Sequence, residues 1–127
     1  MDIVIPLDIC NTLTEQVVYE KTAASYGSGL VEVYATPAMI SLMERTCMTS
    51  VLSYLPKAYA TVGTKVDIKH LKATPVGMKV SCSSELIEID SKRLVFKVVA
   101  HDEQGIIGTG FHERYIIDID RFMRKIK

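Results

Sequence analysis

The sequence predicts an α+β fold in which one long helix is wrapped by a curved antiparallel sheet of about five strands. Apolar residues recur at intervals of three and four between residues 37 and 54, which is the period of a helix with one buried face. Four β-like segments separated by short turn sequences follow from residue 61, as in consecutive antiparallel hairpins. A single sheet packed on a single helix buries both apolar faces. At 127 residues the chain is expected to form one domain over 1–127.

The first 35 residues are predicted to contribute one strand and one irregular segment. A strand is expected at about 14–19, and the segment KTAASYGSGLVEVYA at 21–35 is rich in Ala, Ser and Gly. Such a composition is typical of a loop, and we interpret this segment as a loop or flap before the helix.

The long helix is predicted to begin at Pro37 and to end near residue 54. Thr36 precedes a proline, which disfavours helical dihedral angles, so Thr36 is expected to be the N-cap with Pro37 as the first helical residue. Pro56 is expected to stop the helix.

The remaining strands are predicted at 61–70, 78–90, 93–102 and 105–120. The turn sequences DSK and DEQG join the last three as tight hairpins. In 61–70 the alternation is regular, and one face is expected to hold Val62, Thr64, Val66, Ile68 and His70. An open sheet of this kind leaves an edge or a face to be covered, and self-association is the simplest cover.

Composition excludes several classes of function. Fifteen basic and fifteen acidic residues leave no net charge, so no long-range field for nucleic acid is expected. The opening MDIVIPLDIC lacks the pattern of a secretory signal, and no apolar run approaches the length that spans a membrane. The three cysteines, Cys10, Cys47 and Cys82, form no C-x-x-C pair, so neither a zinc site nor a disulfide framework is indicated. A protein of the reducing cytoplasm is expected.

Glu44 is the residue of the helix that does not fit its pattern. It stands one turn after Ile40 and one turn before Met48, within the predicted apolar stripe. A carboxylate there costs several kcal/mol unless it is paired or hydrogen-bonded. Glu44 is therefore a candidate general acid, general base or nucleophile. The alternative is a structural role, as a salt bridge with Arg45 or at a solvent-facing rim of the helix.

His70 and Thr36 are further candidates. His70 ends a strand whose other inward residues are mostly apolar, which would place an imidazole at the mouth of the enclosed space; a half-buried structural histidine is the alternative. The hydroxyl of Thr36 could contribute to a site, although capping alone explains it. Eight residues of helix rise about 12 Å, so Thr36 cannot touch Glu44 along the helix.

Gly63 and Arg114 are the remaining candidates. Gly63 could bring a backbone N–H close to a developing oxyanion, or could mark a bulge. Arg114 ends the segment HER at 112–114 and could bind a carboxylate or phosphate, or face solvent; His112 is a weaker candidate. Since acid, histidine and hydroxyl occur without a metal or cofactor motif, the residues favour hydrolysis or proton transfer.

Three segments carry a resemblance to a known family: ATPAMISLMERTC, VGTKVDIKHLKATPVGMKV and AHDEQGIIGTGFHER. In order and spacing they resemble the fluoroacetyl-CoA thioesterase-like branch of the hotdog-fold thioesterases, over about residues 33–122. The resemblance implies a hotdog fold and hydrolysis of a short acyl-CoA thioester. It also implies a homodimer with the acyl pocket near the protomer interface, and association into a tetramer is left open.

The same resemblance implies roles for individual residues. Thr36, Glu44 and His70 would form the catalytic group, and Gly63 and Arg114 would bind substrate. No metal and no separate cofactor is implied, since coenzyme A is part of the substrate.

Two other functions are kept open. One is a non-catalytic dimer that binds acyl-CoA or another small ligand, and the other is a hotdog dehydratase. The segment 21–35 has only Tyr26 and Tyr34 as aromatic residues, so selectivity for a fluorinated acyl group is not predicted.

Overall fold

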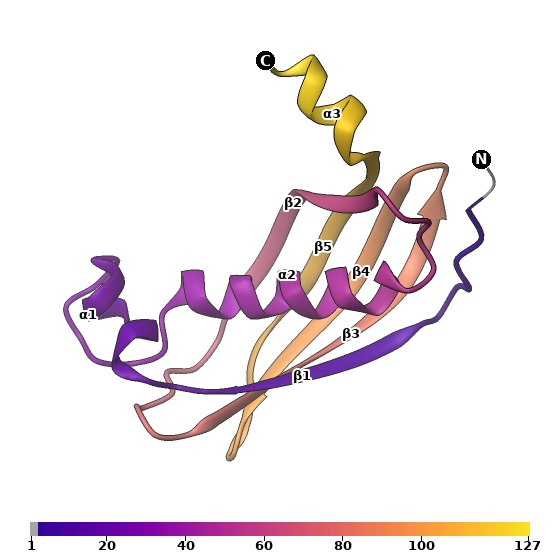
Figure 1. Ribbon diagram of the computed structural model, residues 1–127. Helices are drawn as coiled ribbons and strands as arrows, with labels where there is room; N and C mark the ends of the chain where they lie inside the picture. Colours follow the sequence, from indigo (N-terminus) through magenta and orange to yellow (C-terminus); the bar gives the residue numbers. More distant parts are fainter. Residues whose placement is uncertain (1–2) are drawn as a thin grey trace.

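A five-stranded antiparallel sheet curves around one long helix in the computed structural model, which describes residues 3–127 (Figure 1). The strands are β1 (Cys10–Gln16), β2 (Tyr59–His70), β3 (Lys79–Asp90), β4 (Arg93–Asp102) and β5 (Gly105–Asp118). Their spatial order is β1-β3-β4-β5-β2, and every neighbouring pair is antiparallel. The helix α2 (Thr36–Leu52) lies across the sheet. The predicted fold class is confirmed.

The core lies between α2 and the sheet. The buried apolar residues of α2 recur at intervals of three, four and one, as the period of 3.6 requires: Ala38, Met39, Leu42, Met43, Cys47 and Val51. They pack against buried residues of the strands, which include Val80, Leu86, Phe96 and Ile107. Each such side chain contributes roughly 1.5–3 kcal/mol by leaving water, so this contact determines where α2 sits over the sheet.

The start of α2 differs from the prediction by one residue. Ala35 is the N-cap, with φ −75° and ψ 143°, and no side chain caps the helix. Thr36 is already helical, and its hydroxyl bonds to His70 instead of a backbone amide. At the other end the helix stops at Leu52, before the predicted residue 54.

The irregular segment before α2 contains more structure than predicted. A 3₁₀ turn, η1 (Tyr19–Lys21), precedes a short helix, α1 (Ala23–Tyr26). The hydroxyl of Thr22 accepts the N–H of Ser25 at 3.2 Å, and Gly27 ends the helix in the left-handed region with φ 76°. The prediction of a loop over 21–35 is therefore wrong at α1, and the first strand, β1, lies earlier than the predicted 14–19.

A C-terminal helix, α3 (Ile119–Lys125), which the sequence did not predict, follows β5, and the predicted strand 105–120 ends two residues early, at Asp118 (Figure 1). The carboxylate of Asp118 caps it by accepting the N–H of Arg121 at 3.3 Å. No helix formed by residues 3–127 is long and apolar enough to cross a membrane.

A bulge in β2 changes which of its residues face α2. Gly63 pairs with Arg114 and Lys65 pairs with Glu113, so Thr64 is an extra residue on β2. Strict alternation would put Gly63 and His70 on opposite faces, since they are seven residues apart. With the bulge, both face α2. The prediction that Val62 and Thr64 share the face of His70 is therefore wrong.

Candidate active site

Thr36 and His70 form the first part of the candidate site. The hydroxyl of Thr36, at the start of α2, lies 2.8 Å from Nδ1 of His70, at the end of β2. Both residues line a pocket of about 310 Å³, together with Ala23, Ser28, Val33, Tyr34, Leu71, Lys72 and Ala73. The other ring nitrogen of His70, Nε2, is buried and has no hydrogen-bond partner within residues 3–127. The imidazole is thus held at one nitrogen and unpaired at the other.

Burial sets the protonation of His70. It lowers the pKa of the imidazole below the ordinary 6.5, and the backbone at Lys72 opposes part of this shift. His70 is therefore neutral at pH 7, which is the form that can accept a proton.

Glu44 forms the second part of the site, together with Arg114. Its Oε2 lies 3.8 Å from Nη1 of Arg114; the Glu44 side chain is 42% exposed and that of Arg114 6%. Glu44 is therefore at the margin of the buried face of α2: its predicted place within the apolar stripe is wrong, and the alternative of a solvent-facing rim of the helix is confirmed. The alternative salt bridge with Arg45 is also wrong, because Arg45 pairs with Glu15 on β1.

Gly63 leaves the space that Glu44 occupies. A Cβ at this position would lie 2.8 Å from Oε2 of Glu44 and 3.4 Å from Nη1 of Arg114. Any side chain here would have to displace the carboxylate. Gly63 also begins the bulge of β2, so the predicted bulge is confirmed.

Arg114 is buried and anchored on three of its nitrogens. Nε donates to the hydroxyl of Thr61 at 2.7 Å, Nη2 donates to the Thr61 carbonyl at 2.9 Å, and Nη1 lies 3.1 Å from Nε2 of His112. The alternative that Arg114 faces solvent is therefore wrong. His112, which the sequence ranked as weaker, is fully buried beside it. The sequence signal that could have identified His112 is its position two residues before Arg114, because residues two apart on a strand face the same side.

The five predicted site residues fall into two groups within the chain. Thr36 and His70 form one, and Glu44, Gly63 and Arg114 form the other. Along α2 the groups are about 12 Å apart, and along β2 they are roughly 20 Å apart. A single chain therefore does not bring its carboxylate to its histidine.

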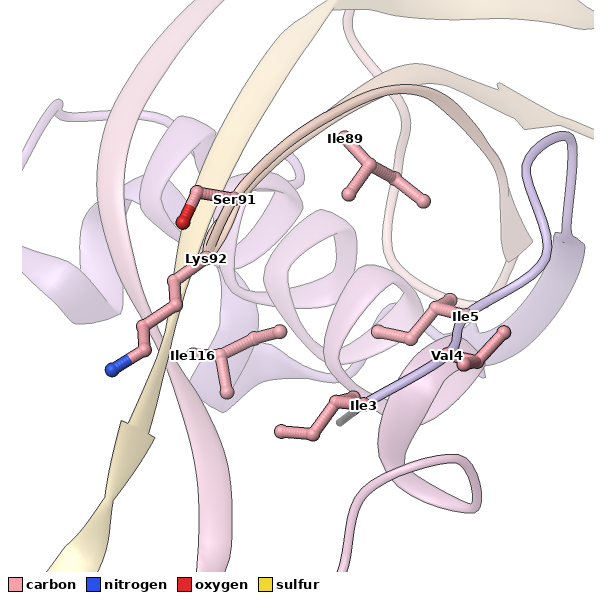
Figure 2. Close-up of a pocket in the computed structure, with 7 residues that line it drawn as sticks. All are labelled: Ile3, Val4, Ile5, Ile89, Ser91, Lys92 and Ile116. Atoms are coloured by element: carbon pink, nitrogen blue, oxygen red, sulfur yellow. The ribbon is translucent and has the colours of Figure 1, made fainter. Parts of the chain in front are cut away.

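A larger cavity of about 570 Å³ lies elsewhere and contains none of the predicted site residues (Figure 2). Its walls are mostly apolar and come from the N-terminal segment, the β3–β4 turn and β5: Ile3, Val4, Ile5, Ile89, Ser91, Lys92 and Ile116. The walls hold no acid, histidine or thiol, and their Ser91 hydroxyl and Lys92 ammonium lie exposed in the β3–β4 turn with no base among the lining residues to activate them. We therefore assign the site by its chemistry rather than by cavity size.

Comparison with known proteins identifies the family. The profile of the family described as fluoroacetyl-CoA-specific thioesterase matches residues 17–120. The chain belongs to this family. It is also 38% identical over 96 residues to the fluoroacetyl-CoA thioesterase of Streptantibioticus cattleyicolor, a match that covers 76% of this chain and 69% of the relative. The resemblance predicted from the three sequence segments is confirmed.

Solved structures of this thioesterase family share the fold. The fluoroacetyl-CoA thioesterase FlK matches with a TM-score of 0.91 and 32% identity, over 97% of this chain and 96% of that one. An FlK variant solved in complex with acetyl-CoA matches equally well, with a TM-score of 0.91 and 31% identity over 96% of each chain. A thioesterase superfamily member from Thermus thermophilus matches with a TM-score of 0.89 and 26% identity, over 97% of this chain and 91% of that one. The prediction of a hotdog thioesterase fold is confirmed.

Proposed function

We propose that the protein is an acyl-CoA thioesterase that hydrolyses a small acyl-CoA to the free acid and coenzyme A. The hydrogen bond between Thr36 and His70 carries this proposal, because it orients a neutral imidazole whose second nitrogen is unpaired within residues 3–127. Such a group can transfer a proton during acyl transfer. Family membership supports the thioester, and the pocket of about 310 Å³ beside the pair supports a small acyl group.

A second copy of the chain completes the site in this proposal. β2 is an edge strand, paired with β5 on one side and with no strand of residues 3–127 on the other. Antiparallel pairing of two β2 strands, about a two-fold axis midway between Gly63 and His70, would set Gly63 opposite the partner's His70. Since the Glu44 carboxylate lies where a side chain at Gly63 would be, the carboxylate of one copy would then meet the histidine of the other. The homodimer therefore joins the two groups that one chain keeps apart.

The chemistry of this composite site needs one attacking oxygen and one proton donor. Glu44 supplies the oxygen, either from its own carboxylate or from a water molecule whose proton it takes. If water attacks, a C–O bond forms at the thioester carbonyl and the C–S bond breaks; the proton that Glu44 took from water passes to His70, which delivers it to the departing thiolate. If the carboxylate itself attacks, the thiolate leaves as the anion and an anhydride forms. Water then cleaves the anhydride, and His70 takes a proton of that water and passes it to the thiolate.

The other site residues orient these groups. Thr36 holds the ring of His70, Gly63 leaves room beside Glu44 and helps to hold the carbonyl, and Arg114 positions the substrate by its charge. These residues supply every group that the hydrolysis uses, so the proposed reaction includes no metal and no separate cofactor. We place it in the cytoplasm, where the free thiols of Cys10, Cys47 and Cys82 stay reduced.

A thiol-release assay tests the function. Wild type, Glu44→Gln and His70→Ala would be assayed with coenzyme A thioesters from acetyl to phenylacetyl, fluoroacetyl included. We expect release by wild type from at least one small acyl-CoA, and a loss of orders of magnitude in both variants. Unchanged rates in both variants would contradict the roles of Glu44 and His70. Thermal stabilisation of wild type by an acyl-CoA without any release would instead establish a non-catalytic binding protein.

A further inference from the structure

His112 lies beside the proposed site but has no part in the reaction as described so far. It is 1% exposed, and it stands two residues before Arg114 on β5, so both side chains face α2. Glu113, between them, faces the other way and accepts the Nε–H of Arg93 at 2.9 Å. The buried histidine is therefore directed at the arginine by the alternation of the strand.

The contacts of His112 determine its protonation. Nδ1 lies 2.7 Å from the carbonyl oxygen of Lys65, which can only accept, so Nδ1 carries the hydrogen. Nε2 lies 3.1 Å from Nη1 of Arg114, which can only donate, so Nε2 must be the acceptor. Burial lowers the pKa of His112, and the charge of Arg114 acts in the same direction. The ring is neutral, with one defined tautomer.

The hydrogen bonds of Arg114 show what this acceptor does. A guanidinium has five N–H donors. Thr61 takes one from Nε and one from Nη2, and His112 takes one from Nη1. Nη1 is also the atom nearest to Glu44, at 3.8 Å, a distance longer than a hydrogen bond. His112 therefore takes one of the two N–H groups of Nη1 and fixes the position of this nitrogen relative to Glu44.

We propose that His112 is a positioning residue for the thioesterase reaction, which anchors the Arg114 guanidinium so that Nη1 stands 3.8 Å from the Glu44 carboxylate instead of closing on it. A direct hydrogen bond from Arg114 to Glu44 would occupy the carboxylate oxygen that the reaction needs. A Cβ on Gly63 would lie 3.2 Å from Cε1 of His112 and 2.8 Å from Oε2 of Glu44. The absence of a side chain at Gly63 therefore leaves room for both residues. The inference rests on the proposed function, in which Glu44 supplies the attacking oxygen.

Two matched substitutions separate the hydrogen bonds of His112. The amide of asparagine reaches the position of Nδ1, so His112→Asn keeps the bond to Lys65 and loses the acceptor for Arg114. The amide of glutamine reaches the position of Nε2, so His112→Gln keeps that acceptor. We expect His112→Asn to lower kcat roughly tenfold to a hundredfold, the loss of one hydrogen bond to a charged group, with KM little changed. His112→Gln should stay within about threefold of wild type, since its acceptor remains.

The outcomes distinguish this inference from the proposed function. Equal losses in both folded variants, or wild-type kcat in His112→Asn, would overturn the role of His112 while wild-type thioesterase activity stands. No release by wild type from any acyl-CoA would overturn the proposed function, and the inference with it. In an Arg114→Gln background, His112→Asn should have no further effect; a full additional loss would show that His112 does not act through Arg114. If His112→Asn does not fold, His112→Ser, whose side chain is too short to reach Arg114, takes its place, and a wild-type kcat there would overturn the inference.

Discussion

The hydroxyl of Thr36 lies 2.8 Å from Nδ1 of His70, although the two residues are 34 positions apart in the chain. The contact forms because α2 begins over the end of β2. Its consequence is an oriented imidazole whose pKa is lowered by burial. The predictions that follow test this pair, the carboxylate that it needs, and the packing that holds both in place.

Removal of the Thr36 hydroxyl should slow catalysis without a change in fold. Thr36→Ala loses one neutral hydrogen bond, worth about 0.5–1.5 kcal/mol, so kcat should fall about twofold to tenfold. Thr36→Ser keeps the hydroxyl and is the matched control. Steady-state kinetics on both variants make the comparison, and an equal loss in Ser and Ala would contradict a role for the hydroxyl.

Mixing two inactive variants tests whether the site is shared between subunits. Glu44→Gln and His70→Ala should each be inactive as pure proteins. After joint unfolding and refolding at equal amounts, half of the dimers would be mixed, and each would hold one intact site. Activity should then recover to about a quarter of wild type, as two-fold symmetry requires. A site contained within one chain would give no recovery.

A methyl group at position 63 should displace the carboxylate. The added Cβ of Gly63→Ala would lie 2.8 Å from Oε2 of Glu44, closer than real Cβ contacts allow. Because the tip of Glu44 can move, the expected result is a loss of kcat of roughly tenfold or more with a Tm within a few degrees of wild type. Val62→Ala, on the next residue and facing away from α2, is the control. Normal kcat in Gly63→Ala would show that the position of Glu44 is unimportant.

The activity should depend on pH through His70. Because burial lowers its pKa, the acidic limb of kcat/KM should lie below the ordinary 6.5. Stability should change in the same direction as activity. Because the unfolded state binds the His70 proton at a higher pH than the folded state, the free energy of unfolding decreases as pH falls below 6.5. A pH–rate profile tests this, with His101→Ala as the control. An acidic limb above pH 7 would contradict the assignment.

Tyr34 should stabilise the fold through Glu15. The tyrosine hydroxyl donates to Oε2 of Glu15 at 2.6 Å. Lys21 and Arg45 form salt bridges with Oε1 of the same carboxylate. Burial raises the pKa of Glu15, but these hydrogen bonds outweigh it and lower the pKa below 4.5. Tyr34→Phe should cost about 1–3 kcal/mol at pH 7, as expected for a buried hydrogen bond to a charge.

The pH dependence of that loss has a defined sign. A lowered carboxylate pKa contributes stability above pH 4.5 and loses it as pH falls through the folded pKa, so the difference between wild type and Tyr34→Phe should shrink in acid. Denaturant titrations at pH 7 and at acidic pH measure it. Tyr26→Phe, on an exposed tyrosine, is the control and should change little at either pH. A constant difference at both pH values would contradict the contact.

Much of the fold could be predicted because its signals are local. The apolar period located α2, and the turn sequences placed the hairpins at Asp90–Arg93 and Asp102–Gly105. The helix α1 was missed because four residues give too short a pattern, and α3 because it continues the apolar run of β5. The N-cap was placed one residue late, since the sequence does not reveal that the Thr36 hydroxyl bonds to His70.

The sequence by itself determined the α+β class, the family, and the residue types that the chemistry needs. Only the tertiary structure decided how these residues group: Thr36 with His70, and Glu44 with Gly63 and Arg114. The physical reason is that periodicity specifies the face on which a side chain lies, whereas one extra residue in β2 reverses that face. The burial of His112 could not be predicted either, because it depends on contacts between β2 and β5, far apart in the chain.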